Sequence, residues 1–187
     1  DAPILLHPGS AGRRKGLGVL LDAYARLASR RVPAPFLYRV GPNDLRARHR
    51  EQLARMVRSG QAAEINRYVS TADLADAFAA CDWVAMPYRK FRHSSGVLAL
   101  ARAANRPVVA PDYGHIAQQV RDGQPGRLYR HGSTPDLARV VATLKPDEAL
   151  SAPTPGRDAL RSVEAAHRAF VANLSNWVAR IDQETSG

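Results

Sequence analysis

Residues 88–113 constrain the fold more than any other part of the sequence. A basic loop leads to two serines and a glycine at 94–96, and a run rich in alanine and leucine follows them. A polar turn at 105–107 then leads to an apolar run at 108–110. This order is typical of a helix start, a helix that lies close against a sheet, and a parallel strand buried on both faces. We therefore expect a strand–loop–helix unit here.

The same unit recurs along the rest of the chain. The leucines of 17–28 form one apolar stripe at helical spacing, and similar patterns alternate with short apolar runs. The expected strands are 4–8, 36–40, 64–69, 82–87, 108–110 and 126–130. The expected helices are 17–28, 45–58, one capped by Ser70 or Thr71, one that starts at 94–96, 115–121 and one from 133 to 144. This alternation predicts an α/β fold with a doubly wound, Rossmann-like parallel sheet.

The sequence divides into one folded domain and a C-terminal extension. A chain of 187 residues has the length of a single domain. We expect a Rossmann-like domain at 1–144, a proline-rich linker at 145–156 and a long C-terminal helix within 157–187. That helix carries a strong apolar stripe, so it is expected to pack on this domain or on a missing one. Because the chain begins with Asp1 rather than Met, we interpret it as a fragment of a longer protein.

The net charge of +10 is the unusual feature of the composition. Lysine occurs only at positions 15, 90 and 145, so 24 of the 27 basic residues are arginine. A solvated basic surface is the simpler interpretation, and peripheral contact with an acidic membrane is the alternative. A specific nucleic-acid partner is not expected, because no recognisable module and little aromatic interleaving accompany the charge.

The cellular compartment is indicated by what the sequence lacks. The single cysteine, Cys81, excludes a disulfide within the chain. No run of residues has the length of a transmembrane span or the pattern of a signal peptide. We therefore expect a cytoplasmic protein, with the inner face of the membrane as its only candidate membrane contact.

The residues after the first expected strand are suited to an anion. Gly9 permits close approach of the backbone, and Arg13, Arg14 and Lys15 precede the first helix. A helix N-terminus next to three cations favours a phosphate. Neither a Walker loop nor a GxGxxG fingerprint is present. Taken alone, a solvated basic turn is an equal alternative for this loop.

Ser94, Ser95 and Gly96 form the second candidate site. Hydroxyls and free amides at a helix start can bind phosphate, although the same residues are also ordinary N-caps. In a doubly wound sheet, ligands bind beyond the carboxyl ends of the strands, so both loops are expected on the same edge. Their combination favours a diphosphate.

In order and spacing, these pieces resemble the C-terminal, donor-binding domain of the GT-B glycosyltransferases of group 1, the glycogen synthase and mannosyltransferase-like family. The resemblance covers about residues 4–144. The residues that carry it are Gly9, Arg14-Lys15-Gly16, Val40-Gly41, Tyr68-Val69-Ser70, Asp73-Leu74, the run from Ala79 to Pro87, Ser95-Gly96-Val97-Leu98, the run from Asn105 to Ala110, Gly114, Val120-Arg121-Asp122-Gly123 and Gly126.

The resemblance implies a nucleotide-diphosphate sugar as donor substrate and a role in polysaccharide or glycolipid synthesis. Lys15, with Arg13 or Arg14, would neutralise the diphosphate. The amides near Ser95 and Gly96 would hold the phosphate or the sugar. An N-terminal domain outside this chain would supply the acceptor site, so this polypeptide alone is not expected to turn over.

Two further contacts and the absence of a cofactor are implied in the same way. The backbone near Val69 would meet the base, and His93 would hydrogen-bond the donor sugar. No metal or other cofactor is implied, because the basic side chains neutralise the diphosphate. None of the six histidines has a convincing metal-ligand spacing to another.

The sequence departs from the family at a pair of glutamates, one in the loop and one in the following helix. Arg92 or His93 stands at the loop position, and Leu100 stands at the helix position. No acidic residue lies between Tyr88 and Pro111. A catalytically inactive glycosyltransferase-like binding or scaffolding module is therefore the alternative function. A third hypothesis is a different binding protein with a doubly wound sheet. It would be a flavodoxin-like regulator or one half of a nucleotide-sugar epimerase. The regulator is disfavoured because no acidic cluster follows the strands.

Overall fold

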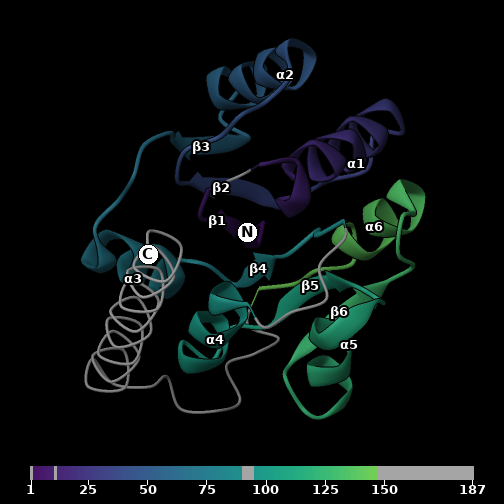
Figure 1. Cartoon of the computed structure of the whole chain (residues 1–187). Helices are drawn as coiled ribbons and strands as arrows, with labels where there is room; N and C mark the ends of the chain where they lie inside the picture. The colour runs from purple at the N-terminus through teal and green to yellow at the C-terminus, as the bar shows by residue number, and fades with distance from the viewer. Residues whose placement is uncertain (1, 11, 90–94, 147–187) are drawn as a thin grey trace, which may run out of the picture.

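The computed structural model describes residues 2–10, 12–89 and 95–146 of the chain. They form a parallel sheet in the order β3-β2-β1-β4-β5-β6, with helices on both faces (Figure 1). This confirms the doubly wound α/β fold. The strands are β1 (Ile4–Pro8), β2 (Phe36–Val40), β3 (Ala62–Ile65), β4 (Trp83–Ala85), β5 (Val108–Pro111) and β6 (Gly126–Tyr129). The helices are the 3₁₀ turn η1 (Arg13–Lys15), α1 (Leu17–Ser29), α2 (Ala47–Arg58), α3 (Thr71–Ala80), α4 (Gly96–Ala103), α5 (Gly114–Arg121) and α6 (Thr134–Val141).

Two hydrophobic clusters, one on each face of the sheet, form the core. Successive residues of β1 belong to different clusters, because side chains alternate between the faces of a strand. Leu5 packs with the apolar side chains of α1, α2 and α6, whereas Leu6 packs with those of α3, α4 and α5. Figure 1 shows the same division, with α1, α2 and α6 on one side of the sheet and α3, α4 and α5 on the other.

The start and the buried face of α2 differ from the prediction. The helix begins at Ala47 rather than at residue 45, because Arg46 has the extended backbone of an N-cap. Leu45, the expected first residue, is buried and lies before the helix. The sequence pattern predicts that Val57, at the end of the same helix, faces inward, but its side chain is exposed (39%). It follows Met56 of the buried face, and a rotation of about 100° per residue turns it outward.

β3 is shorter and lies earlier than the predicted strand 64–69. It pairs with β2 from Ala62 to Ile65, and the two strands end together at Val40 and Ile65. The following residues lead to α3. Its N-cap is Ser70, one of the two residues expected there, and Ser70 forms a capping box with Asp73.

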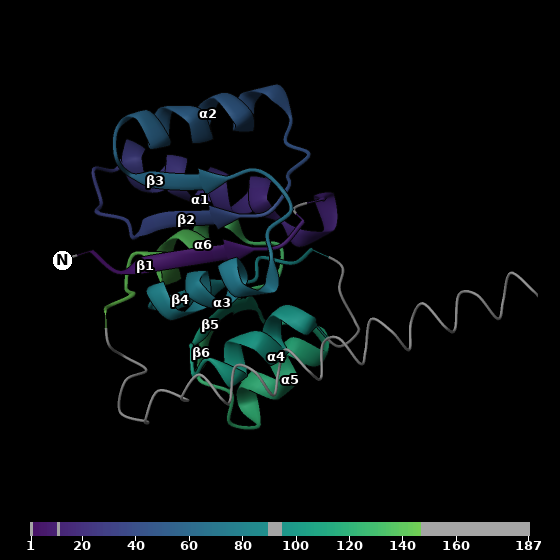
Figure 2. The same ribbon diagram turned by 90° about the vertical axis from the view of Figure 1, so that its left-hand side faces the viewer.

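The loops that follow β1 and β4 lie side by side at the carboxyl edge of the sheet. Because all strands are parallel, they end at one edge, where η1 also lies (Figure 2). The chain order reverses between β1 and β4, and the Arg89 amide donates to the Arg14 carbonyl across this point (3.0 Å). Such a switch point is the ligand crevice of doubly wound sheets.

Several predictions fall on residues that the structure does not describe. They are His93, Ser94, nearly all of the linker 145–156 and the C-terminal helix of 157–187. Among the residues that are described, no helix is long and apolar enough to cross a membrane.

Candidate functional site

The loop after β1 packs directly on the ends of β2 and β4. Gly9 donates its amide to the Val40 carbonyl (2.8 Å). Gly16, which ends the 3₁₀ turn, has a φ of +73°, and a Cβ there would lie 1.8 Å from the carbonyl oxygen of Pro87. Only glycine fits this contact without moving one of the two loops. Gly16 therefore holds η1 against the segment that leads to α4.

Lys15 lies on the inner side of this loop. Its Nζ is 5.3 Å from the centroid of the Tyr88 ring and 3.5 Å from the place that a Cβ on Gly9 would occupy. Burial, followed by the charges of Arg14 and Arg39, lowers the pKa of Lys15. Within the described residues no carboxylate forms an ion pair with it. The ammonium is thus partly desolvated and positioned to meet an anion.

Tyr88 joins the first loop to the start of α4. Its hydroxyl lies 3.4 Å from Oγ of Ser95, and its ring faces the ammonium of Lys15. Burial raises the pKa of Tyr88 to about 12, so the phenol is neutral. Ser95 is the N-cap of α4, but its side chain makes no capping hydrogen bond. The first amides of the helix, those of Gly96 and Val97, have no intrahelical acceptor.

The structure therefore brings together residues that the sequence placed in two separate loops. Lys15 and Ser95 meet through Tyr88, and Gly96 opens the adjoining helix. Arg13 and Arg14 are exposed on η1. The three consecutive cations thus occupy different environments, with only the last one held inside.

Val69 is not part of this group. It lies between β3 and α3, partly buried against the cluster of α3, α4 and α5. The other two predicted residues, His93 and Ser94, lie outside the described residues.

Sequence reasoning missed Arg39 and His7, which lie under the loop. They are register partners on β2 and β1 and are 0% and 1% exposed. The Arg39 guanidinium donates to the carbonyls of His7 (3.1 Å), Pro42 (2.7 Å) and Val40. An arginine within an otherwise apolar strand was the available signal, because arginine is rarely buried without a partner.

Arg39 and His7 are both buried, but only Arg39 carries a charge at neutral pH. Burial lowers the pKa of Arg39 to about 10, which leaves it charged at neutral pH. Burial, followed by the charge of Arg39, lowers the pKa of His7 to about 3, so His7 is neutral. Its Nε2 faces the Lys15 carbonyl at 3.3 Å. The floor of the site therefore carries a positive charge beneath Lys15.

The arrangement suits a polyanion. It combines a partly buried ammonium, a buried guanidinium and the N-terminus of a helix, which together favour phosphate oxygens. Asp112, the acidic residue after β5, is paired with Arg121. In the described part of the chain no group of three His, Cys, Asp or Glu residues is placed to hold a metal ion.

Comparison with known proteins gives the family. A family model described as glycosyl transferases group 1 matches residues 2–147. The chain belongs to this family. A relative from Catenulispora acidiphila, named D-inositol 3-phosphate glycosyltransferase 2, is 33% identical to this glycosyltransferase domain over 152 residues. The match covers 77% of this chain and 35% of the relative, so the chain spans about a third of that protein.

Solved structures show which part of the fold the glycosyltransferase domain represents. The C-terminal domain of a group 1 glycosyl transferase from Francisella tularensis is 18% identical with a TM-score of 0.55, and the match covers 75% of this chain and 80% of that one. Anabaena HepE, solved with UDP and glucose, is 22% identical with a TM-score of 0.61 over 93% of this chain and 48% of HepE. These likenesses confirm the fold as that of the C-terminal domain of a GT-B glycosyltransferase.

Proposed function

We propose that this domain binds a nucleoside-diphosphate sugar where β1 and β4 end. Joined to an N-terminal domain, it would transfer the sugar to a glycan or glycolipid acceptor in the cytoplasm, with peripheral contact to an acidic membrane. The observation that carries the proposal is the Lys15–Tyr88–Ser95 arrangement, which connects an ammonium to the N-terminus of α4 through one tyrosine. The complexes of HepE with UDP and with UDP-glucose support it, as does the name of the Catenulispora relative.

Each part of the site has a role in this proposal. Lys15, with Arg13 or Arg14 from the exposed side of η1, neutralises the diphosphate without a metal or other cofactor. Arg39 adds positive charge from below, and the first amides of α4 bind the phosphate next to the sugar. The backbone around Val69 meets the base.

Replacing Lys15 by alanine tests the proposal. We expect the affinity for the preferred nucleoside diphosphate to fall about tenfold or more, because a charge-assisted hydrogen bond contributes roughly 1.5–3 kcal/mol. Calorimetric titration with UDP, GDP, ADP and their sugar conjugates at two salt concentrations measures this. Lys145→Ala, at an exposed lysine beyond α6, is the matched control for loss of one charge. Equal affinities of the Lys15 and Lys145 variants would remove the diphosphate from this loop.

A catalytically inactive binding module is the second candidate function. Leu100, which stands where the family has a glutamate, is partly buried against the apolar cluster of α3, α4 and α5. No carboxylate lies between residues 88 and 111 to contact the ribose or the sugar. A protein of this kind would bind the nucleotide sugar without releasing the nucleoside diphosphate. An assay for that release, made on the chain joined to an N-terminal domain, separates the two functions.

A further inference from the structure

A cavity lies beside η1, between the start of α1 and the loop from β2 to α2. It has a volume of about 150 Å³, and its basic lining residues are Arg13, Arg46, Arg48 and Arg89. We call it the arginine cavity. Lys15 does not line it, so Arg13 and Lys15 face different places although only one residue separates them.

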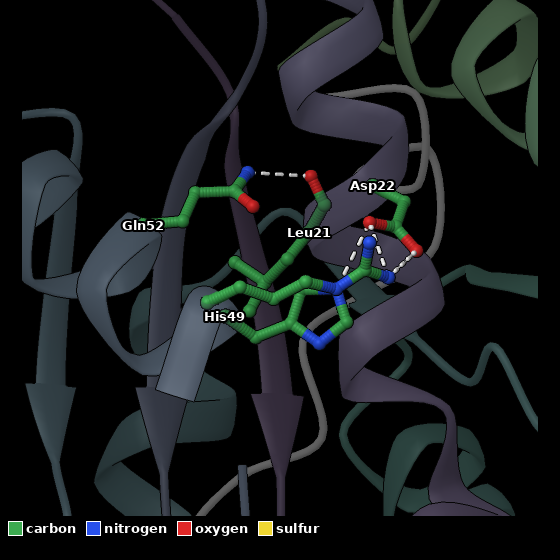
Figure 3. Close-up of polar contacts among 5 residues, drawn as sticks. Leu21, Asp22, His49 and Gln52 are labelled. Atoms are coloured by element: carbon green, nitrogen blue, oxygen red, sulfur yellow. Dashed lines mark hydrogen bonds and ion pairs between the residues drawn. The ribbon is translucent and has the colours of Figure 1, made fainter. Parts of the chain in front are cut away.

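One wall of the arginine cavity contains a buried histidine that is fixed in orientation. His49 of α2 is 7% exposed, and its Nε2 lies 2.9 Å from Oδ1 of Asp22 on α1. Gly18 makes room for the ring, because a Cβ there would lie 2.8 Å from Nδ1. Gln52 joins the same two helices through the carbonyl of Leu21 (2.6 Å). Figure 3 shows both contacts between α1 and α2.

The contact with Asp22 determines what the other ring nitrogen of His49 can do. An ionised carboxylate only accepts hydrogen bonds, so Nε2 carries a proton and Nδ1 of the neutral ring is an acceptor. No group among the described residues hydrogen-bonds to Nδ1. In Figure 3, Nδ1 of His49 points in the same direction as the strand arrows, towards the carboxyl edge of the sheet. His49 thus offers one free acceptor at the wall of the cavity.

The charges around the cavity favour a dianion. Four guanidiniums line it against two carboxylates, those of Asp22 and Asp44, which leaves two positive charges in excess. Asp22 is already engaged by Arg48 (3.3 Å) as well as by His49. The adjoining starts of α1 and α2 have no side-chain cap, so their first amides add further donors.

We propose that the arginine cavity binds a phosphate monoester group. The phosphate oxygens accept hydrogen bonds from Arg13, Arg46 and Arg48, and a hydroxyl of the ligand donates to Nδ1 of His49. In a phosphate monoester dianion, which has no P–OH, that hydroxyl belongs to the attached sugar, and in inorganic phosphate it is the P–OH of the dianion. The cavity volume of about 150 Å³ admits a phosphate group. The site is separate from the nucleoside-diphosphate site at Lys15 and does not depend on it.

The test follows the ring nitrogens of His49 by ¹⁵N NMR in the 187-residue chain while phosphate is added. Inorganic phosphate and glucose 6-phosphate are the probes, and glucose is the control. We expect phosphate to shift Nδ1 of His49 and to leave Nε2, held by Asp22, nearly unchanged. Inorganic phosphate can donate its own P–OH, so binding of both probes would support the phosphate site, and tighter binding of glucose 6-phosphate would assign the hydroxyl to the sugar. No shift of Nδ1 with either probe would overturn the proposal.

Variants separate this site from the one at Lys15. Arg46→Gln removes one exposed guanidinium from the cavity and is expected to weaken phosphate binding about tenfold. Arg58→Gln, which removes an exposed arginine at the other end of α2, is expected to have no effect. Lys15→Ala should weaken nucleotide binding and leave phosphate binding intact. Loss of phosphate binding in Lys15→Ala, or equal affinities of Arg46→Gln and Arg58→Gln, would contradict a separate cavity site.

Discussion

Arg39 shows how one buried residue sets the charge of a site. In the described part of the chain its guanidinium hydrogen-bonds to carbonyls, and Nε has no partner. Glu64, its register partner on β3, acts on it through space. The sequence could predict Lys15, because a cation in a glycine-rich loop is a recognised signal. The sequence marks Arg39 only as an arginine within an apolar strand, because a strand pattern does not show which carbonyls its side chain will reach.

Replacing Arg39 by methionine removes this charge with little change in length. We expect the pKa of Lys15 to rise towards its usual range, because Arg39 is one of the groups that lower it. Binding requires a protonated Lys15, so affinity falls as pH rises through its pKa. The variant should therefore lose affinity at a higher pH than the original chain. Calorimetric titration with UDP from neutral to alkaline pH measures the change, with Arg30→Met on the exposed end of α1 as control. An unchanged alkaline limit would show that Arg39 acts only on structure.

At the scale of the elements, the order of strands and helices followed from the periodicity of apolar residues. β1, β2 and the start of α1 lie where the sequence predicted them. The start of α2 differs from the prediction because it depends on the backbone of the preceding loop. The ends of β3 differ because they are set by pairing with β2. The contact of Gly16 with Pro87 was also beyond the sequence, since it joins two loops that are distant in the chain. Such contacts between elements complete the site.

Gly16→Ala tests the contact between η1 and the segment after β4. Gly60 offers a matched control, because its φ of +70° is close to the +73° of Gly16 and nothing lies within 4 Å of a Cβ there. We expect Gly60→Ala to lower the free energy of unfolding by about 1 kcal/mol from backbone strain alone. Gly16→Ala should cost at least about 1–3 kcal/mol more, because its Cβ overlaps the Pro87 carbonyl. Urea denaturation of both variants measures the difference. Equal losses would mean that the two loops separate freely.

For the whole molecule, the carboxyl edge of the sheet is divided by η1 into two basic regions. The sequence predicted one anion site from the run Arg13 to Lys15. Residues of a 3₁₀ turn point about 120° apart, so neighbouring cations must face different directions. Lys15 therefore turns towards Tyr88, and Arg13 towards the arginine cavity. The Asp22–His49 pair could not be predicted either, because it forms only when α1 and α2 pack together.

The stability of the whole fold is expected to depend on His7 in acid. Folding lowers its pKa from 6.5 to about 3, because the ring is buried beside Arg39. Between these values the unfolded chain binds more protons, so stability is complete above pH 6.5 and is lost as pH falls. The loss is about 2 kcal/mol between pH 7 and pH 5, and urea denaturation at the two values measures it. His7→Gln should remove this component, whereas His115→Gln, at an exposed residue of α5, should leave it. If His7→Gln lost as much stability in acid as the original chain, another group would be responsible.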